Sequence, residues 1–344
     1  MTLAVVSATV PDLLRLVAVP VFAWAAVRDV RIRRVPSAVW IPLGVLGAAL
    51  LVWDGWTAWH AGGVVWSREF LLPAAVSLGF VAPLAYLFWW IGGFGGADAK
   101  ALLVLALLYP TYPVYVVAGY SFPLTATPVG SFAFTILTNA VVVALAIPVS
   151  LAIRNAAAGR VGPITFVGRP IAAERLPEVH GRLLASPDGR ARGGLDLDAL
   201  RMYLRWRGLT LADVRDEPAR YRDPASLPDE PNPPTDGIVT ATHSTDGGDA
   251  DEPDDDGSTT VEDWPHTPRD GSRPIDDPWG AKAFLEDIEG SAYGTTPAEL
   301  RAGLEAVAEA DRVWVSPGIP FLVPVFVGFV IALVYGDLLV GLVF

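Results

Sequence analysis

Long apolar runs without a charged residue constrain this 344-residue chain more than any other feature. Four such runs cover residues 35–53, 70–97, 101–153 and 316–336. A helix of about 20 mostly apolar residues crosses the ~30 Å hydrocarbon core of a bilayer. Each run is long enough for one crossing, and the run 101–153 is long enough for two. The sequence therefore predicts an all-α polytopic membrane protein.

We expect about six transmembrane helices, near residues 8–28, 36–53, 70–91, 99–120, 132–153 and 317–343. The first is interrupted only by Asp12 and Arg15, which are three residues apart and are expected to pair on one helical face. The run 101–153 is expected to divide where Pro, Gly, Ser and Thr cluster, at 121–131. A cleaved signal peptide is the alternative for the first run, but its arginine cluster follows the apolar residues instead of preceding them.

Basic residues gather on one side of the predicted helices. They are Arg28, Arg31, Arg33, Arg34, Lys100, Arg154 and Arg160, whereas the opposite side has Arg68 beside Glu69. Because positively charged loops favour the cytoplasmic side, we expect a multi-pass cell-membrane protein with both termini outside. The four arginines of the first loop are expected to determine topology. The alternative is that one of them stabilises an ionised Asp29 or holds substrate carbonyls.

The net charge of -12 belongs to one part of the chain, because the acidic residues concentrate between residues 156 and 316. We expect a membrane core of five helices at 1–155, a cytoplasmic polar domain at 156–222, an acidic disordered linker at 223–268, a cytoplasmic helical segment at 269–316 and a final transmembrane helix at 317–344. The linker has 13 acidic and no basic residues, and such a composition buries too little apolar area to fold. With two lysines in the whole chain, this acidity is expected to solvate a protein of a salty cytoplasm. Electrostatic attraction of basic substrates is the alternative.

Two helices are predicted within the polar part. Asp196 is a candidate N-cap and Gly208 a C-terminal stop for one of them. Thr296, Pro297 and Glu299 form a capping-box start for the other, which is expected to lead into the final span. The chain has no cysteine, which excludes disulfides, thiolate zinc sites and thiol catalysis. The four histidines are too scattered to predict a metal site.

Two carboxylates are predicted to share one depth at the membrane boundary. Asp29 closes the first span in RDVRIRRVPS, and Asp98 closes the third in GGFGGADAK. Both spans run from outside to inside, so both carboxylates are expected at the cytoplasmic face. Neighbouring carboxylates share a proton. One then activates a water molecule, while the protonated one polarises a scissile carbonyl and later protonates the leaving amine, without a metal or cofactor.

The glycines of that second segment, Gly92, Gly93, Gly95 and Gly96, are expected to let the backbone leave the helix and admit an extended substrate beside Asp98. Each signal has a simpler explanation. An aspartate beside arginines at a helix end is commonly a surface ion pair, and a glycine-rich segment between helices is commonly only a turn. Their coincidence at one face favours a site.

These residues resemble the prepilin peptidases of the GxGD class of intramembrane aspartyl proteases, and most closely the archaeal branch that processes preflagellins (archaellins) and type IV prepilins. The resemblance covers roughly residues 8–155 and the last span. It makes Asp29 and Asp98 the catalytic pair, with Gly95, Gly96, Ala97 and Lys100 as the supporting loop. Ala97 stands where the strict motif has its second glycine, and alanine adopts a positive φ less readily than glycine.

The resemblance implies an aspartic endopeptidase that removes a basic leader peptide from preflagellin-like or type IV prepilin-like precursors at the cytoplasmic face. Its partners would be these precursors and the lipid membrane. No nucleic acid and no cofactor is implied, and the oligomeric state stays open. Bacterial relatives carry a cysteine-bearing methyltransferase region, and its absence here favours a peptidase without that second activity.

Two functions of other classes stay open from the residues. A proton- or cation-coupled transporter would use Asp29 and Asp98 to bind its ion, although both are expected at one face instead of the midplane. A membrane anchor for an acidic interaction domain would depend on residues 223–268, which a peptidase would need little.

Overall fold

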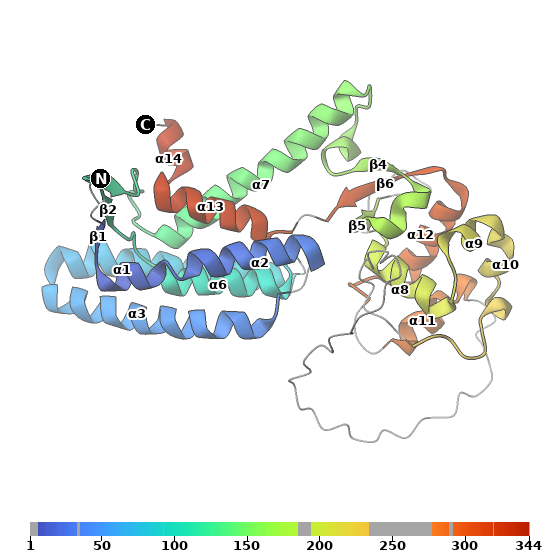
Figure 1. The fold of residues 1–344 in the computed structure, drawn as a ribbon, viewed down its shortest axis with the longest axis horizontal. Coiled ribbons are helices and arrows are strands. Elements are labelled where there is room, and N and C mark those ends of the chain that lie inside the picture. The colour runs from blue at the N-terminus through green and yellow to red at the C-terminus, as the bar shows by residue number, and fades with distance from the viewer. Residues whose placement is uncertain are drawn as a thin grey trace, which may run out of the picture. The chain divides into compact units, whose positions relative to one another are not determined.

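The computed structural model describes residues 6–32, 35–91, 93–184, 194–233, 277–288, 292–318 and 320–343. The chain divides into two compact units, residues 1–159 with 319–344 and residues 160–318. We call them the membrane unit and the polar unit, and Figure 1 labels their helices and strands. The candidate site residues all belong to the membrane unit.

Four helical stretches of the membrane unit are long and apolar enough to cross a bilayer: Val10–Arg31, Ser37–Ala61, Val65–Trp90 and Phe132–Ala157. The first consists of α1 (Val10–Arg15) and α2 (Ala18–Ile32), and the second of the 3₁₀ turn η1 (Ser37–Val39) and α3 (Trp40–Ala61). The third contains the π-helical η2 (Val65–Leu71) and η3 (Ser77–Val81) with α4 (Leu72–Val76) and α5 (Ala82–Trp90), and the fourth is α7 (Phe132–Ala157). The predicted polytopic helical membrane protein is confirmed.

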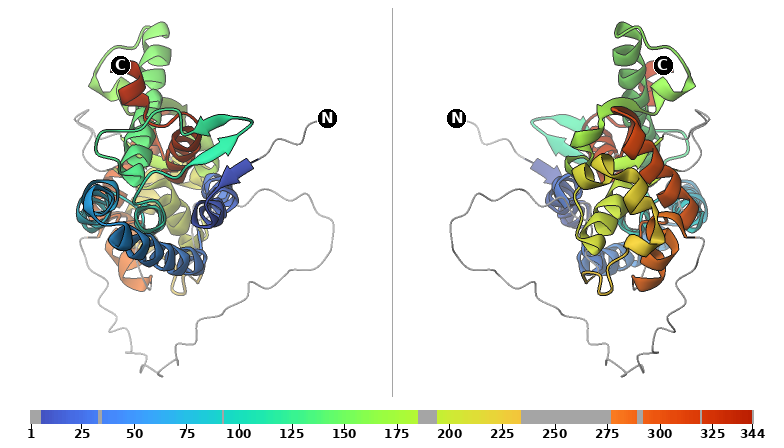
Figure 2. Two further views of the ribbon diagram at one scale, coloured as in Figure 1. Left: turned by 90° about the vertical axis from the view of Figure 1, so that its left-hand side faces the viewer. Right: turned by 90° about the vertical axis from the view of Figure 1, so that its right-hand side faces the viewer.

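The predicted helix 99–120 is wrong in its second half. The helix α6 (Gly96–Leu108) stops just before Pro110 and Pro113, which have no backbone N–H to donate to a helix. The strands β2 (Tyr115–Val117) and β3 (Tyr120–Phe122) follow and pair antiparallel, and β1 (Val6–Ala8) pairs antiparallel with β2. Figure 2 shows this small sheet beside the helices of the unit. The all-α prediction missed it.

The last predicted helix, 317–343, is divided into α13 (Leu322–Val334) and α14 (Leu338–Val343). Gly336 lies between them with φ +97, a conformation that glycine adopts readily. The preceding residues 312–317 form a strand of the polar unit, so the helix begins later than predicted.

Aromatic side chains pack where the helices of the membrane unit meet. Phe22 of α2 lies edge to face against Trp40 of α3 and Phe329 of α13, at ring-centroid distances of 5.3 and 5.8 Å. Tyr109, which follows α6, lies 5.1 Å from Phe329. Lipid tails are as apolar as these side chains, so close packing and internal hydrogen bonds hold such helices together. The packing fixes the helices that carry the two aspartates.

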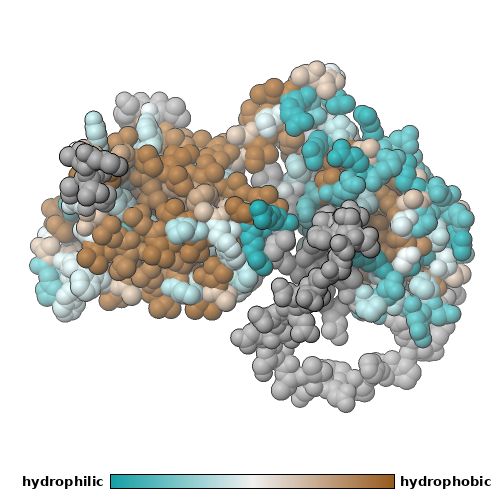
Figure 3. Space-filling view, in the orientation of Figure 1, coloured by the Kyte–Doolittle hydropathy of each residue, from teal (hydrophilic) through white to brown (hydrophobic). Residues whose placement is uncertain are grey.

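The surface of the membrane unit is apolar over the helices, as the brown area in Figure 3 shows. Large exposed side chains include Val45, Trp56 and Leu145. Contiguous apolar surface of this extent marks a lipid interface.

The polar unit contains a three-stranded antiparallel sheet and several short helices. The sheet has the order β4 (Arg169–Ala172), β6 (Arg312–Pro317), β5 (Gly181–Leu183). The α-helices are α8 (Leu197–Arg207), α9 (Leu211–Asp216), α10 (Pro218–Arg222), α11 (Ala281–Asp287) and α12 (Pro297–Glu309). Short 3₁₀ turns are η4 (Pro163–Phe166), η5 (Ala173–Glu178), η6 (Pro224–Ser226) and η7 (Pro278–Gly280).

Both helices predicted in this unit are confirmed by their caps. The Asp196 carboxylate accepts a hydrogen bond from the backbone N–H of Asp198 at 2.9 Å, and Gly208 ends α8 with φ +67. Thr296 and Glu299 form the reciprocal capping box, with bonds of 2.8 and 3.2 Å. The expectation that this second helix leads into the final span is wrong, because α12 ends at Glu309 and β6 follows.

The first residues of the predicted linker, 224–232, are held to the polar unit. The backbone N–H of Asn232 donates to the carbonyl of Trp206 at 2.9 Å, and its side-chain amide donates to the carbonyl of Arg205 at 2.8 Å. These bonds attach 224–232 to the end of α8. The rest of the predicted linker, 234–268, lies outside the described residues.

Candidate active site

Asp29 lies near the end of α2 and is buried, with 8% of its surface exposed. On the same helix, the guanidinium of Arg28 lies over the ring of Trp24, 5.4 Å from its centroid. Cations are attracted to aromatic faces at such distances. The first arginine of the RDVRIRR loop is thus placed against an aromatic ring, and Arg33 and Arg34 lie outside the described residues.

Asp98 lies in the first turn of α6, where its carboxylate accepts a hydrogen bond from the backbone N–H of Gly95 at 3.0 Å. Helix N-termini have backbone N–H groups without intrahelical partners, and the Asp98 side chain caps one of them. A Cβ on Gly95 would lie 3.1 Å from the Asp98 carboxylate oxygen. Glycine is therefore favoured at position 95 by this close approach, since its φ of -66 suits any residue.

Ala97 lies within α6 and is not among the residues with positive φ. The expected strain of alanine at the position of the motif's second glycine is therefore absent. Gly96 begins the helix, and a Cβ there would meet the Trp89 indole nitrogen at 3.9 Å, an ordinary contact. As predicted, the chain leaves the helix in the glycine-containing segment between the end of α5 at Trp90 and the start of α6 at Gly96. Gly92 lies outside the described residues.

An aromatic stack holds this loop. The Phe94 ring lies between Phe88, at a centroid distance of 4.9 Å, and Phe321, at 4.5 Å, with near-parallel planes. The backbone N–H of Gly93 donates to the Phe88 carbonyl at 2.7 Å. Offset stacking of this kind stabilises a pair by about 0.5–1.5 kcal/mol beyond burial. The loop before Asp98 is thus fixed to α5 and to the start of α13.

Lys100 joins the two motif segments. Its ammonium group donates to the Ser37 hydroxyl at 2.6 Å, and Ser37 begins the helix that follows the arginine-rich loop. Sequence reasoning placed Lys100 in the supporting loop without naming a partner for it. Ser37, Phe88 and Phe321 were missed, because nothing in their local sequence indicates proximity to Asp98.

The carboxyl groups of Asp29 and Asp98 interact electrostatically. Asp98 precedes the apolar run 101–108 and lies outside the four helices long enough to cross a bilayer. Burial, and secondly the Asp29 carboxylate, raise the pKa of Asp98 to about 7, against a smaller opposing effect of the Gly95 hydrogen bond. Burial and a neighbouring carboxylate both favour the protonated form of Asp98 while Asp29 is ionised. This arrangement suits acid–base chemistry on a water molecule.

Comparisons with known proteins point to one family. Residues 16–152 match the model of the type IV leader peptidase family, and residues 280–338 match the model described as archaeal Peptidase A24 C-terminus type II. Together the matches cover more than half of the chain and include both aspartates, the glycine loop and Phe321. No match was found among curated proteins.

Proposed function

Because the chain belongs to the type IV leader peptidase family, we propose that this peptidase is an aspartic endopeptidase whose catalytic pair is Asp29 and Asp98. The observation that carries the proposal is the placement of two carboxyl groups, Asp29 buried near the end of α2 and Asp98 in the first turn of α6, close enough for Asp29 to raise the pKa of Asp98. Aspartic proteases use two neighbouring carboxyl groups that share one proton. With its pKa raised to about 7, Asp98 still carries a proton in a substantial fraction of molecules at neutral pH.

In the proposed reaction, the ionised carboxylate removes a proton from a water molecule, and the water oxygen attacks the scissile carbonyl carbon. The protonated carboxyl donates a hydrogen bond to the carbonyl oxygen. The tetrahedral intermediate then collapses as the C–N bond breaks, and the leaving amine takes a proton from the pair. The products are a leader peptide with a new carboxylate and a precursor with a new amine, and the pair again holds one proton.

We propose that the substrates are prepilin-like or preflagellin-like precursors with a basic leader, cleaved at the cytoplasmic face. The positive-inside distribution of Arg28, Arg31 and Lys100 supports this placement and, with it, a cytoplasmic polar unit.

The test uses the full chain in lipid vesicles, with a purified precursor that carries a basic leader. We expect a single cleavage at the end of the leader, detected by mass spectrometry of both products, in the presence of a metal chelator. The same vesicles loaded with a pH-sensitive dye report proton flux. Flux without cleavage would reject the peptidase in favour of a transporter.

The pH dependence of kcat/KM follows from the shared proton. The pair is active with one proton, so activity should fall as pH rises through about 7, where that proton leaves. Above this value, the rate should decrease about tenfold per pH unit, because the active form then decreases in that proportion. A rate that stays constant from pH 6 to pH 9, at constant folded protein, would contradict a singly protonated pair.

A further inference from the structure

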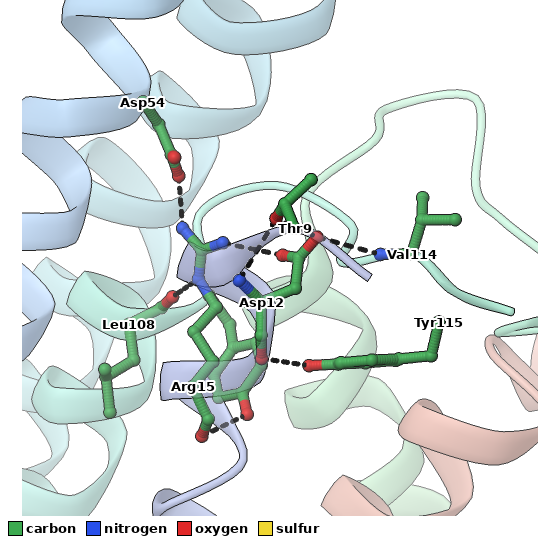
Figure 4. A network of polar contacts seen from close by, with 8 residues as sticks. Thr9, Asp12, Arg15, Asp54, Leu108, Val114 and Tyr115 are labelled. Atoms are coloured by element: carbon green, nitrogen blue, oxygen red, sulfur yellow. Dashed lines mark hydrogen bonds and ion pairs between the residues drawn. The ribbon is translucent and has the colours of Figure 1, made fainter. Parts of the chain in front are cut away.

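A buried polar cluster joins α1, α3 and α6 at the end of the helices opposite the two aspartates. Figure 4 shows its centre, Arg15, surrounded by Asp12, Asp54 and the carbonyl of Leu108. Arg15 is 3% exposed and Asp12 is 7% exposed. The predicted pairing of these two residues is confirmed, with a distance of 2.8 Å between guanidinium and carboxylate. The proposed reaction does not use this cluster.

The N–H groups of Arg15 bind acceptors on three helices, α1, α3 and α6. Besides Asp12 of its own helix, it contacts the carboxylate of Asp54 on α3. Its Nε donates to the carbonyl of Leu108, the last residue of α6, at 2.6 Å. The last carbonyls of a helix have no intrahelical donor, so this bond caps α6. A planar guanidinium offers several donors in a fixed geometry, which an ammonium group does not.

A second bond runs in the opposite direction. The Tyr109 hydroxyl donates to the carbonyl of Arg15 at 2.7 Å, so the end of α6 and the α1–α2 junction are joined twice. The Asp12 carboxylate accepts in addition from the Thr9 hydroxyl at 2.7 Å. The Tyr115 hydroxyl donates to the Asp12 carbonyl at 3.0 Å. The junction is therefore held on several sides.

The bonds between the end of α6 and the α1–α2 junction matter because α2, which carries Asp29, and α6, which carries Asp98, pack mainly against other helices. The helix α2 packs chiefly against α13, whereas α6 packs chiefly against α3 and α5. Asp29 lies roughly 20 Å along the helix from Arg15, and Asp98 roughly 15 Å from Leu108, at ~1.5 Å rise per residue. A tilt of about 4° at the tied end would therefore move a carboxyl group by about 1 Å. Displacement of a reacting group by 1 Å commonly lowers a rate about 100-fold.

We infer that Arg15 is a positioning residue of the peptidase: by fixing the end of α6 to the α1–α2 junction, it sets how Asp98 faces Asp29 at the other end. The inference rests on the proposed function of the two aspartates. Arg15 contacts neither Asp29 nor Asp98 and acts through the rigidity of the two helices that carry them.

The experiment compares the variants Arg15→Lys and Tyr109→Phe with the unsubstituted enzyme in vesicles. Arg15→Lys keeps the charge but loses the forked donors, and we expect kcat to fall about 10- to 100-fold with KM unchanged within about twofold. The basic limb of the pH profile should move to lower pH, because separated carboxylates repel each other less. Tyr109→Phe removes one hydroxyl, which a folded protein tolerates, and should lower kcat about 3- to 10-fold.

The matched control is Asp337→Asn. This buried carboxylate accepts from Thr135 at 3.2 Å and from the backbone of Leu339 at 2.9 Å, and it lies on neither aspartate helix. The Asp337→Asn substitution should lower thermal stability without changing kcat or the basic limb of the pH profile. If Arg15→Lys and Tyr109→Phe likewise change only stability, Arg15 is structural and the inference is wrong.

A measurement without substrate separates this inference from the proposed function. The chain contains no cysteine, so the only two spin labels can be placed at Val30→Cys on α2 and Leu103→Cys on α6. We expect Arg15→Lys to shift or broaden their distance distribution by about 1–2 Å. An unchanged distribution overturns the inference. Cleavage by an Asp29→Asn variant would instead overturn the proposed function and leave this result standing.

Discussion

Replacing Asp98 with Asn is expected to reduce precursor cleavage about 100- to 10,000-fold, and Asp29→Asn should do the same. An amide can neither remove a proton from water nor return one to the leaving amine, and loss of such a group typically costs 10²- to 10⁴-fold. The amide oxygen introduced by Asp98→Asn can still accept the hydrogen bond from Gly95, so α6 should remain capped. The measurement is the cleavage rate at saturating precursor and equal amounts of folded enzyme.

The control for these substitutions is Glu69→Gln, an exposed acid of the same unit on the opposite side from Asp98. It should leave the rate unchanged. The double variant Asp29→Asn with Asp98→Asn should be no slower than either single variant, because the two groups act as one unit. Full activity of either single variant would remove the aspartate pair from the mechanism.

Replacing Gly328 with Val is expected to prevent stable assembly of the membrane unit. A Cβ at this position of α13 would lie 2.6 Å from the backbone nitrogen of Ala140 and 2.9 Å from its Cα, both on α7. Backbone atoms cannot move aside as a flexible side chain can, so the two helices must separate. Overpacking typically costs about 1–3 kcal/mol and occasionally more, and a clash with backbone atoms puts this position at the upper end. The substitution should also disturb the candidate active site, because α2, which carries Asp29, packs against α13.

Thermal unfolding in detergent, followed by size-exclusion chromatography, measures this effect. Gly79→Val is the matched control, since a Cβ at Gly79 meets no atom within 4 Å. The control should unfold within a few degrees of the unsubstituted protein, whereas Gly328→Val should yield little folded protein. Equal stability of both variants would contradict the close crossing of α7 and α13.

Local patterns predicted the parts of this fold that depend on neighbouring residues. Charge-free runs located the helices that cross the bilayer, because their length is set by the hydrocarbon thickness. The Asp12–Arg15 pair and the caps at Asp196 and Thr296 were found from residues two to three positions apart. The positions of Asp29 and Asp98 at helix ends were sufficient to propose a pair, and their catalytic roles remain a prediction.

Long-range contacts were beyond prediction from one sequence. The bond from Arg15 to Leu108, the stack of Phe94 on Phe321 and the bond from Lys100 to Ser37 each join distant segments. Apolar composition also hid the end of α6, because the residues after Leu108 remain apolar while prolines break the helix. The β1–β2–β3 sheet was missed for the same reason.

The stack of Phe94 on Phe321 has a consequence for the order in which a ribosome delivers this chain. The glycine loop and both aspartates are synthesised within the first third of the sequence, but the ring that completes the stack follows more than 200 residues later. The helix on which α2 packs is made later still. A nascent chain that has reached the polar unit therefore holds both carboxylates without the support that fixes their surroundings. Completion of the site thus waits until the residues that follow the polar unit have been synthesised.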